Sequence, residues 1–246
     1  MMWPAHEAPG LVVAPDASIG AGVLFGANVT VHEATVVGEG CAIGDNAVLG
    51  KRPVLSVRST SAGPVDSLVL GREVRVSAGA VLAAGSRFGD GCVVGDLATV
   101  RERVTVGEGV VIGRGVCIEN DVEIGAFTKI QTNAYITAET VLEEHVFIAP
   151  GVVTTNDNLM GRTERRHALK RGPTVRRGAR VGGAVVLLPG IEVGEEAFIG
   201  AGAVVIADVP PRTVVVGVPA RVLRDVPADE LLDAEADARG GRRHGA

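Results

Sequence analysis

One stretch of this chain is strongly basic, although the chain as a whole is acidic. Residues 154–180 hold eight lysines and arginines against two acidic residues, a net charge of +6, whereas the whole chain carries −5. Arginine binds carboxylates and phosphates through paired N–H donors, so this stretch is expected to meet an anionic ligand or a neighbouring subunit. The alternative is a solvated basic surface. The eight are Arg162, Arg165, Arg166, Lys170, Arg171, Arg176, Arg177 and Arg180.

A second polar group differs in being uncharged. Gln131-Thr132-Asn133 lies between Lys129 and Tyr135, the only tyrosine in the chain. Amide side chains of this kind hold a polar ligand through both donors and acceptors. Three other polar groups are charged and are expected to be ordinary solvated faces. They are Arg101-Glu102-Arg103, Glu119-Asn120-Asp121 and Glu143-Glu144-His145.

The cysteines offer no evident nucleophile. There are three, an odd number that argues against a disulfide framework. Cys41 and Cys92 occupy small inward positions of the repeat described next, and Cys117 stands one place later in its own repeat. We therefore expect inert packing thiols.

The elements that must position these residues follow a six-residue repeat. An aliphatic residue, or Phe25 or Phe88, recurs at every sixth place in three runs: Val13 to Leu49, Leu70 to Ile148, and Val175 to Val205. Neither a helical period of 3.6 nor a strand period of 2 keeps this register. A strand and a turn in each hexad bury one face only when copies stack, as in repeat proteins. The 27 hexads, taken three to a coil, predict nine triangular coils of parallel β-structure.

Two breaks in the repeat predict loops that leave this prism. The first is 51–69 and the second is 154–174, both rich in the residues typical of loops. Loops on a rigid scaffold often carry function, although a tolerated surface insertion is the alternative for the first. The domain is predicted to span 1–224. Residues 225–246 are predicted to form a short acidic helix over 225–238, with Asp225 as its N-cap, and a flexible tail.

Composition restricts the class of protein. Net charge is −5, which gives no reason to expect a nucleic-acid partner. No apolar run approaches the ~18 residues of a membrane helix, and no signal peptide is visible. The expected location is therefore the cytoplasm, with no membrane partner.

With its hexads, the chain resembles the hexapeptide-repeat acyltransferases, whose prism is a left-handed β-helix. Blocks 199–205, 208–211 and 216–221 carry this resemblance, which covers roughly residues 13–224. The Gly-x-Pro-Ala-Arg ending is typical of the acyl-CoA-dependent branch. The stretch from Lys129 to Pro173 is similar to the sugar-nucleotide N-acetyltransferases. The resemblance implies a homotrimer with active sites between subunits and acetyl-CoA as co-substrate.

The resemblance implies that Asn133 lies near the acceptor amine and acetyl-CoA along the C-terminal coils, and the other roles are hypotheses from the chemistry of the residues. Asn133 would hold the acceptor amine, and Asp157 or His145 would accept its proton. Gln131 and Asn156 would bind the substrate. Acetyl-CoA would lie along the C-terminal coils, on Gly182, Ala184, Gly200, Ala201, Arg212 and Arg221. Backbone N–H groups near Ala149–Gly151 would stabilise the oxyanion. The alternatives without a catalytic role are a solvated surface histidine for His145 and an ordinary Asx turn for Asn156.

Two departures from the family matter. Sugar O-acetyltransferases of this fold carry a histidine where this chain reads Thr155-Asn156-Asp157, so an amine acceptor is favoured over a hydroxyl. The lysine that often precedes Asp-Val-Pro is Ala207 here. In the first loop, Lys51, Arg52 and Arg58 are expected to bind the diphosphate of a nucleotide-sugar acceptor.

The rival classes use the same prism. A γ-type carbonic anhydrase needs three histidines converging on a metal. Of the five here, only His32 and His145 lie in coils, far apart in sequence, so no metal is expected. A non-catalytic scaffold, an O-acetyltransferase and an N-acyltransferase with a longer acyl chain or an amino-acid acceptor also remain open.

Overall fold

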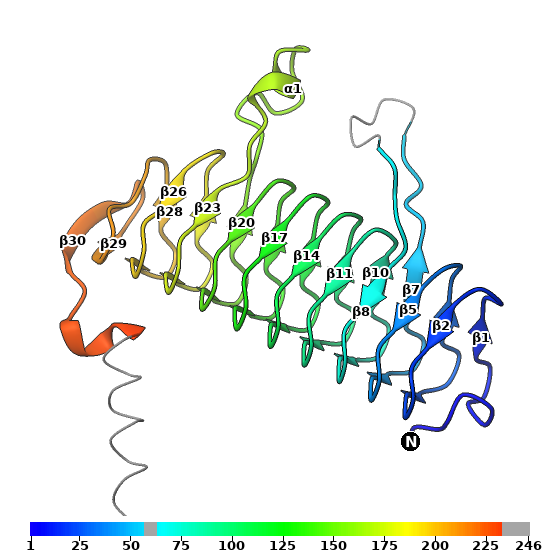
Figure 1. Ribbon diagram of the computed structural model, residues 1–246. Helices are drawn as coiled ribbons and strands as arrows, with labels where there is room; N and C mark the ends of the chain where they lie inside the picture. The colour runs from blue at the N-terminus through cyan, green and yellow to red at the C-terminus, as the bar shows by residue number, and fades with distance from the viewer. Residues whose placement is uncertain (57–62, 233–246) are drawn as a thin grey trace, which may run out of the picture.

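The chain forms a three-sided parallel β-helix. The computed structural model describes residues 1–56 and 63–232. Each coil places one short strand on each of three faces, and the coils stack into a prism (Figure 1). Short parallel strands buried on one side need such stacking, because a single coil cannot cover its own apolar face. The hexad prediction of fold class is confirmed.

The first face has ten strands. They are β1 (Val12–Val13), β4 (Thr30–Val31), β7 (Val48–Lys51), β10 (Val81–Ala83), β13 (Thr99–Val100), β16 (Cys117–Ile118), β19 (Tyr135–Ile136), β22 (Val153–Thr154), β25 (Val186–Leu187) and β28 (Val204–Val205).

The second face has nine strands. They are β2 (Ser18–Ile19), β5 (Val36–Val37), β8 (Val69–Leu70), β11 (Arg87–Phe88), β14 (Thr105–Val106), β17 (Glu123–Ile124), β20 (Val141–Leu142), β23 (Thr174–Val175) and β26 (Glu192–Val193).

The third face has eleven strands, of which only the last is antiparallel. They are β3 (Leu24–Phe25), β6 (Ala42–Ile43), β9 (Arg75–Val76), β12 (Val93–Val94), β15 (Val111–Ile112), β18 (Lys129–Ile130), β21 (Phe147–Ile148), β24 (Arg180–Val181), β27 (Phe198–Ile199), β29 (Thr213–Val216) and β30 (Arg221–Asp225). The nine coils expected from the hexads are slightly too few, because the stack also includes β22, whose inward residue is Thr154, and β29, which follows the last hexad run.

One inward position departs from the aliphatic pattern. Thr154 ends β22 and is 0% exposed, in the place that valine, leucine or isoleucine fills elsewhere. Its Oγ1 accepts a hydrogen bond from the N–H of Thr137 at 2.7 Å and donates one to the carbonyl of Tyr135 at 3.2 Å. The hydroxyl is therefore satisfied inside the core, and the strand continues to the edge of the second loop.

Both loops leave the prism at the same corner. The first joins β7 to β8 and the second joins β22 to β23, so each runs from the first face to the second. Five strand steps along the first face separate them, and both project on the same side of the prism (Figure 1). The predicted breaks are confirmed, although Lys51, Val69, Thr154 and Thr174 belong to the flanking strands. The second loop contains α1 (Arg166–Leu169).

The charged turns at this corner are not all solvated faces, contrary to the expectation for Arg101-Glu102-Arg103 and Glu119-Asn120-Asp121. Glu102 is 0% exposed and Asn120 is 5% exposed. Glu102 Oε1 lies 2.8 Å from Arg101 Nη2 and 3.9 Å from Arg103 Nη2. Arginines on both sides neutralise the carboxylate, which allows it to be buried.

The predicted C-terminal helix does not begin at Asp225. Asp225 is the last residue of β30 instead of an N-cap, and η1 (Ala228–Glu230) follows Pro227. The remainder of the predicted helix and the tail, from residue 233, lies outside the described residues. Within 1–56 and 63–232 no helix has the length and apolar character needed to cross a bilayer.

Candidate functional site

One corner of the prism gathers most of the residues expected to bind acyl-CoA. Asn133 lies in the turn between β18 and β19, where the chain passes from the third face to the first. Gly182 and Ala184 follow β24, and Gly200 and Ala201 follow β27, at the same corner. The carbonyls of Thr132 and Pro150 accept the N–H groups of Gly151 and Ala184, each at 3.0 Å. Successive turns thus form one rigid ridge.

The backbone groups proposed for the oxyanion are already used. The N–H of Ala149 donates to the carbonyl of Val181 at 2.9 Å, and that of Gly151 donates to the carbonyl of Thr132. Pro150 has no N–H to give. The expectation for Ala149–Gly151 is therefore wrong. The middle residues of the neighbouring turns, Thr132 and Gly183, have N–H groups without an acceptor among residues 1–56 and 63–232.

Asn133 is held in a conformation that suits asparagine. Its φ is 59°, in the left-handed region that asparagine adopts more readily than most residues. Its side chain lies over the turn of the preceding coil: a Cβ added at Gly115 would stand 2.5 Å from Asn133 Oδ1. Glycine at 115 therefore leaves room for the amide. Gln131, in the same turn, is half-buried.

Glycine at 182 has a structural cause as well. A Cβ there would come within 2.6 Å of the backbone nitrogen of Ala201 in the next coil. Packing of the coils alone demands this glycine, so its presence is not itself evidence for a cofactor. Arg212 lies in the turn before β29 and Arg221 begins β30, and both are exposed. Arg212 lies at a different corner from Asn133, whereas Arg221 pairs with Val216, at the end of β29 that reaches the corner of Gly200 and Asn133.

Asp157 is committed to folding the second loop. Its carboxylate accepts the N–H of Leu159 at 2.8 Å and of Gly161 at 2.9 Å, and it lies 3.6 Å from Arg166 Nη1. These contacts, led by the N–H of Gly161, hold the pKa of Asp157 below its usual value. A carboxylate with a lowered pKa is a weaker base, so its contacts favour a structural role over the predicted proton transfer.

Asn156 joins the second loop to the prism. Its Nδ2 donates to the carbonyl of Ala138 at 3.3 Å, and its own carbonyl accepts the N–H of Arg171 at 3.0 Å. Asn156 thereby clamps the beginning of the loop to its end. Its role in substrate binding stays a prediction.

His145 lies at a third corner, between β20 and β21. It is exposed and its ring stacks on Phe127, with centroids 5.3 Å apart. A cavity of about 500 Å³ beside it is also lined by Lys129, Phe147 and Arg180. Asn133, Asp157 and His145 thus stand at three different corners, and one chain does not bring them together.

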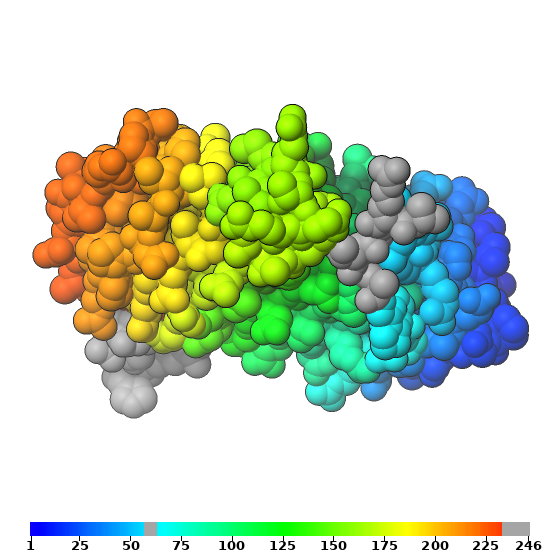
Figure 2. All heavy atoms as spheres, turned by 90° about the horizontal axis from the view of Figure 1, so that it is seen from above, coloured from blue at the N-terminus to red at the C-terminus, as the bar shows by residue number. Residues whose placement is uncertain are grey.

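The basic stretch is largely neutralised within the chain. Five of its eight cations lie 2.6–3.6 Å from carboxylates. Arg176, for example, bridges Glu143 and Glu192. Arg162, Arg165 and Arg171 are exposed and have no ion pair among the described residues. The expectation of a strongly anion-binding loop is therefore reduced to these three, on the loop seen at the front of Figure 2.

The first loop places Lys51 and Arg52 beside the prism. They line a cavity of about 560 Å³ together with Val81, Thr99 and Arg101. Both basic side chains are exposed. Arg58, expected to act with them, lies outside the described residues. The first loop is five coils from the second, and the cavity extends to β13, three coils from the second loop.

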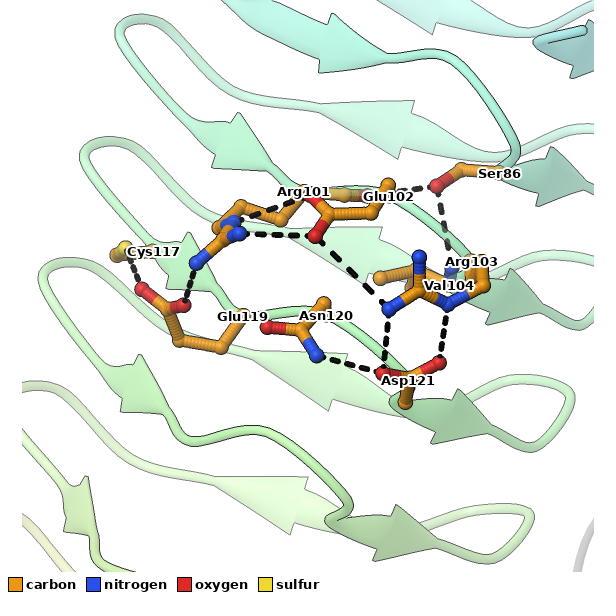
Figure 3. A network of polar contacts seen from close by, with 9 residues as sticks. All are labelled: Ser86, Arg101, Glu102, Arg103, Val104, Cys117, Glu119, Asn120 and Asp121. Carbon is orange, nitrogen blue, oxygen red and sulfur yellow. Dashed lines mark hydrogen bonds and ion pairs between the residues drawn. The ribbon is translucent and has the colours of Figure 1, made fainter. Parts of the chain in front are cut away.

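Two features escaped the sequence interpretation. His167 lies in α1, with its Nε2 3.4 Å from Glu164 Oε2 and its Nδ1 buried without a hydrogen-bond partner in the described part of the chain. A lone histidine in a loop carries no sequence signal of this kind. The second feature is the network of Arg101, Glu102 and Glu119 (Figure 3), for which a run of charged residues replacing Gly-x-Gly was the available signal.

Two of the three cysteines, Cys41 and Cys92, behave as expected, whereas Cys117 is partly exposed on the first face. Cys41 and Cys92 are buried and donate to the carbonyls of Gly71 at 3.2 Å and Gly107 at 3.1 Å. Burial raises the pKa of both thiols. Neither is available as a nucleophile. Among the described residues, no group of three or more His, Cys, Asp and Glu side chains is arranged to hold a metal ion.

Comparison with known proteins supports the repeat. A family profile described as bacterial transferase hexapeptide (six repeats) matches residues 16–51, and one described as hexapeptide repeat of succinyl-transferase matches residues 177–207. A serine acetyltransferase from Buchnera aphidicola subsp. Acyrthosiphon pisum is 38% identical over 86 residues, which cover 35% of this chain and 31% of the relative. A galactoside O-acetyltransferase from Escherichia coli K12 is 34% identical over 89 residues, covering 34% and 42%.

Solved structures of related folds are similar in part. A hexapeptide-repeat acetyltransferase from Vibrio cholerae, in complex with acetyl coenzyme A, has a TM-score of 0.42 and 25% identity, covering 49% of this chain and 70% of that one. This chain spans less than half the length of the two curated relatives. The matching profiles and the three-faced solenoid show that this chain contains hexapeptide repeats, and the two similar sequences are named as acetyltransferases.

Proposed function

We propose that this protein is an acyl-CoA-dependent acyltransferase that transfers acetyl from acetyl-CoA to the amine of an amino-sugar nucleotide. The related sequences are named as acetyltransferases, which supports the reaction class. One observation carries the proposal: the ridge of turns from Asn133 to Gly200 occupies a single corner. It spans three coils, or ~14 Å at the spacing of neighbouring strands. An extended thioester arm lying along it would end beside Asn133.

The chemistry is a direct displacement. The acceptor nitrogen attacks the thioester carbonyl, a C–N bond forms, the C–S bond breaks, and CoA leaves as its thiolate. The amine proton passes to solvent or to the thiolate. The Oδ1 of Asn133 orients the amine, and the N–H groups of Thr132 or Gly183 stabilise the oxyanion. Because Cys41 and Cys92 are buried and the displacement is direct, positioning of the two substrates supplies most of the acceleration.

A homotrimer completes this site. The polar residues of a single chain stand at separate corners, and a site between neighbouring prisms joins corners of two subunits. Arg162, Arg165 and Arg171 of the second loop, which have no ion pair among the described residues, would face the neighbour or its bound substrate. The cytoplasm is the proposed location, where acetyl-CoA is available.

A second candidate is O-acyl transfer. One relative is named galactoside O-acetyltransferase, and His167 places an imidazole in the second loop, with a buried Nδ1 that has no hydrogen-bond partner among the described residues. A hydroxyl must lose its proton during attack, so it requires a base such as this one. The positions where an O-acyl base is expected, 155–157, nevertheless carry no histidine.

Calorimetry with acetyl-CoA and CoA, on protein whose oligomer size is known from gel filtration, tests the donor. Release of CoA thiol with amino-sugar nucleotides, amino acids and hydroxyl sugars as acceptors then tests the reaction. We expect donor binding by a trimer and faster thiol release with amines. A folded protein that binds neither acetyl-CoA nor CoA would refute the proposal. A preference for hydroxyl acceptors that disappears in His167→Ala would support the second candidate instead.

The role of Asn133 has a matched control. Asn46 lies at the same corner in an earlier coil, is exposed, and has a φ of 57° against 59° for Asn133. Asn133→Ala is expected to lower kcat about a hundredfold, the typical cost of misplacing a reactant. Asn46→Ala suffers the same backbone strain and should leave kcat unchanged. Equal losses in both variants would remove Asn133 from the mechanism.

A further inference from the structure

The cavity under the first loop is built differently from the rest of the prism surface. It measures about 560 Å³, a size suited to a small ligand. Its loop side is formed by residues 51–56, and its floor by the outward side chains of Val81 in β10 and Thr99 in β13. The floor is thus partly apolar, while the loop brings charge to it.

The charge at the rim is uncompensated. Lys51 and Arg52 are both exposed, and Lys51 has no ion pair within the described part of the chain. The hydrogen bond of Arg52 Nη1 goes to the carbonyl of Val65 at 3.1 Å, and no carboxylate among residues 1–56 and 63–232 pairs with its positive charge. Two such cations above an apolar floor favour a ligand that combines negative charge with an apolar surface.

At the far end of the cavity, Arg101 is fixed in place. Its Nε and Nη2 donate to the two oxygens of buried Glu102 at 3.1 and 2.8 Å, and its Nη1 donates to Glu119 Oε2 at 2.8 Å (Figure 3). Each terminal nitrogen keeps a second hydrogen. A guanidinium held this firmly loses little conformational entropy when it binds a ligand, so it is preorganised to donate into the cavity.

The cavity is connected to the second loop by the first face. Between them this face presents the outward side chains of Cys117, Tyr135 and Val153, from β16, β19 and β22. Five strand steps from β7 to β22 correspond to ~24 Å. An elongated molecule lying on this face would have one end under the first loop and the other beside Asn156.

We propose that this cavity binds the nucleoside diphosphate end of the acceptor, with the amine end at the second loop, where the trimer of the proposed function would bring Asn133 of a neighbouring subunit. The inference rests on the proposed function and names the place of its substrate. Lys51 and Arg52 bind the diphosphate, and Arg101 donates to the polar edge of the nucleoside. CoA also contains a nucleoside diphosphate. However, the residues expected to bind CoA lie at another corner and in later coils, so the cavity belongs to the acceptor.

Calorimetry on the full chain tests the site without turnover. The probes are uridine, guanosine and thymidine diphosphates, inorganic pyrophosphate and, separately, CoA. Lys51→Ala/Arg52→Ala should weaken diphosphate binding about ten- to a hundredfold, the usual effect of losing charged hydrogen bonds, and leave CoA binding unchanged. Arg75→Ala is the matched control, because Arg75 is exposed on the third face in β9.

A second pair of variants probes the floor of the cavity. Val81→Glu places a carboxylate where the diphosphate would lie, whereas Val36→Glu places one on β5 of the second face, away from the cavity. Only Val81→Glu should abolish diphosphate binding. Equal effects of the two variants would overturn the site.

Failure of the inference is distinguishable from failure of the proposed function. Absence of binding by every diphosphate and by pyrophosphate, with CoA bound and a small amine acetylated, overturns the cavity site alone. A parallel loss of CoA affinity in Lys51→Ala/Arg52→Ala assigns the cavity to the donor and also overturns it. Diphosphate binding without any CoA binding removes the acyltransferase function and, with it, the assignment to an acceptor.

Discussion

The two buried threonines Thr154 and Thr35 allow a quantitative test of how this core tolerates a hydroxyl. Both are 0% exposed. Thr154 Oγ1 makes two hydrogen bonds, to the N–H of Thr137 and to the carbonyl of Tyr135. Thr35 Oγ1 is buried and has no hydrogen-bond partner in the part of the chain that the structure describes. Thr→Val keeps the shape of the side chain and replaces the hydroxyl by a methyl group.

The expected changes in the free energy of unfolding have opposite signs. Thr154→Val leaves the buried N–H of Thr137 without its acceptor, at a cost of about 1–3 kcal/mol. The added methyl group recovers up to ~0.8 kcal/mol, so we expect a net loss of about 1–2 kcal/mol. Thr35→Val deletes an unsatisfied buried hydroxyl and is expected to stabilise the protein by about 1 kcal/mol.

Urea unfolding at one fixed protein concentration measures both variants, because association would otherwise change the apparent stability. Hydrogen exchange of the Thr137 amide gives a local reading at the second loop, where protection should fall only in Thr154→Val. The reasoning fails if Thr154→Val is as stable as the wild type. It also fails if Thr35→Val is destabilised by the same amount.

Two further predictions concern the candidate site. Gly115→Ala should displace Asn133 and reduce acyl transfer, because the new Cβ would stand 2.5 Å from Asn133 Oδ1. Gly91→Ala is the control, since Gly91 has a similar positive φ and open space around it, and it should leave acyl transfer unchanged. Steady-state thiol release compares the two variants, and equal activities would contradict the placement of Asn133. The depressed pKa of Asp157 means that its contribution to loop stability is present above the pKa of an unfolded aspartate and is lost as pH falls through the lower folded value. Limited proteolysis of the second loop should therefore accelerate in acid, and Asp157→Asn should be cleaved at the same rate across that pH range.

The hexads predicted the fold because each anchor reports its own burial. Phe25, Ile112 and Leu187, for example, are all 0% exposed, as the repeat requires. Thr154 broke the pattern because a buried threonine depends on partners in the neighbouring coil, at Thr137 and Tyr135. Glu102 was misread for a similar reason: a charged turn residue is buried here only because two arginines flank it in space.

The site was less predictable than the fold. His145 follows Asn133 by two hexads, so it must stand at a different corner of a three-sided coil. The predicted roles of the two residues would instead require one common corner. The availability of a backbone N–H at Ala149 or Gly151, and the neutralisation of Arg176 by Glu143 and Glu192, depend on contacts between coils. Such contacts leave no mark in the local sequence.

The common corner of the two loops has a consequence for the range of substrates. Because the intervening coils are stacked rigidly, their number sets the distance between the two loops. Adding or removing one 18-residue coil would change that distance by a single step of ~4.8 Å and leave each loop's own contacts intact. Proteins of this fold with a different number of coils between their loops would then select acceptors of different length, and these lengths would differ in discrete increments.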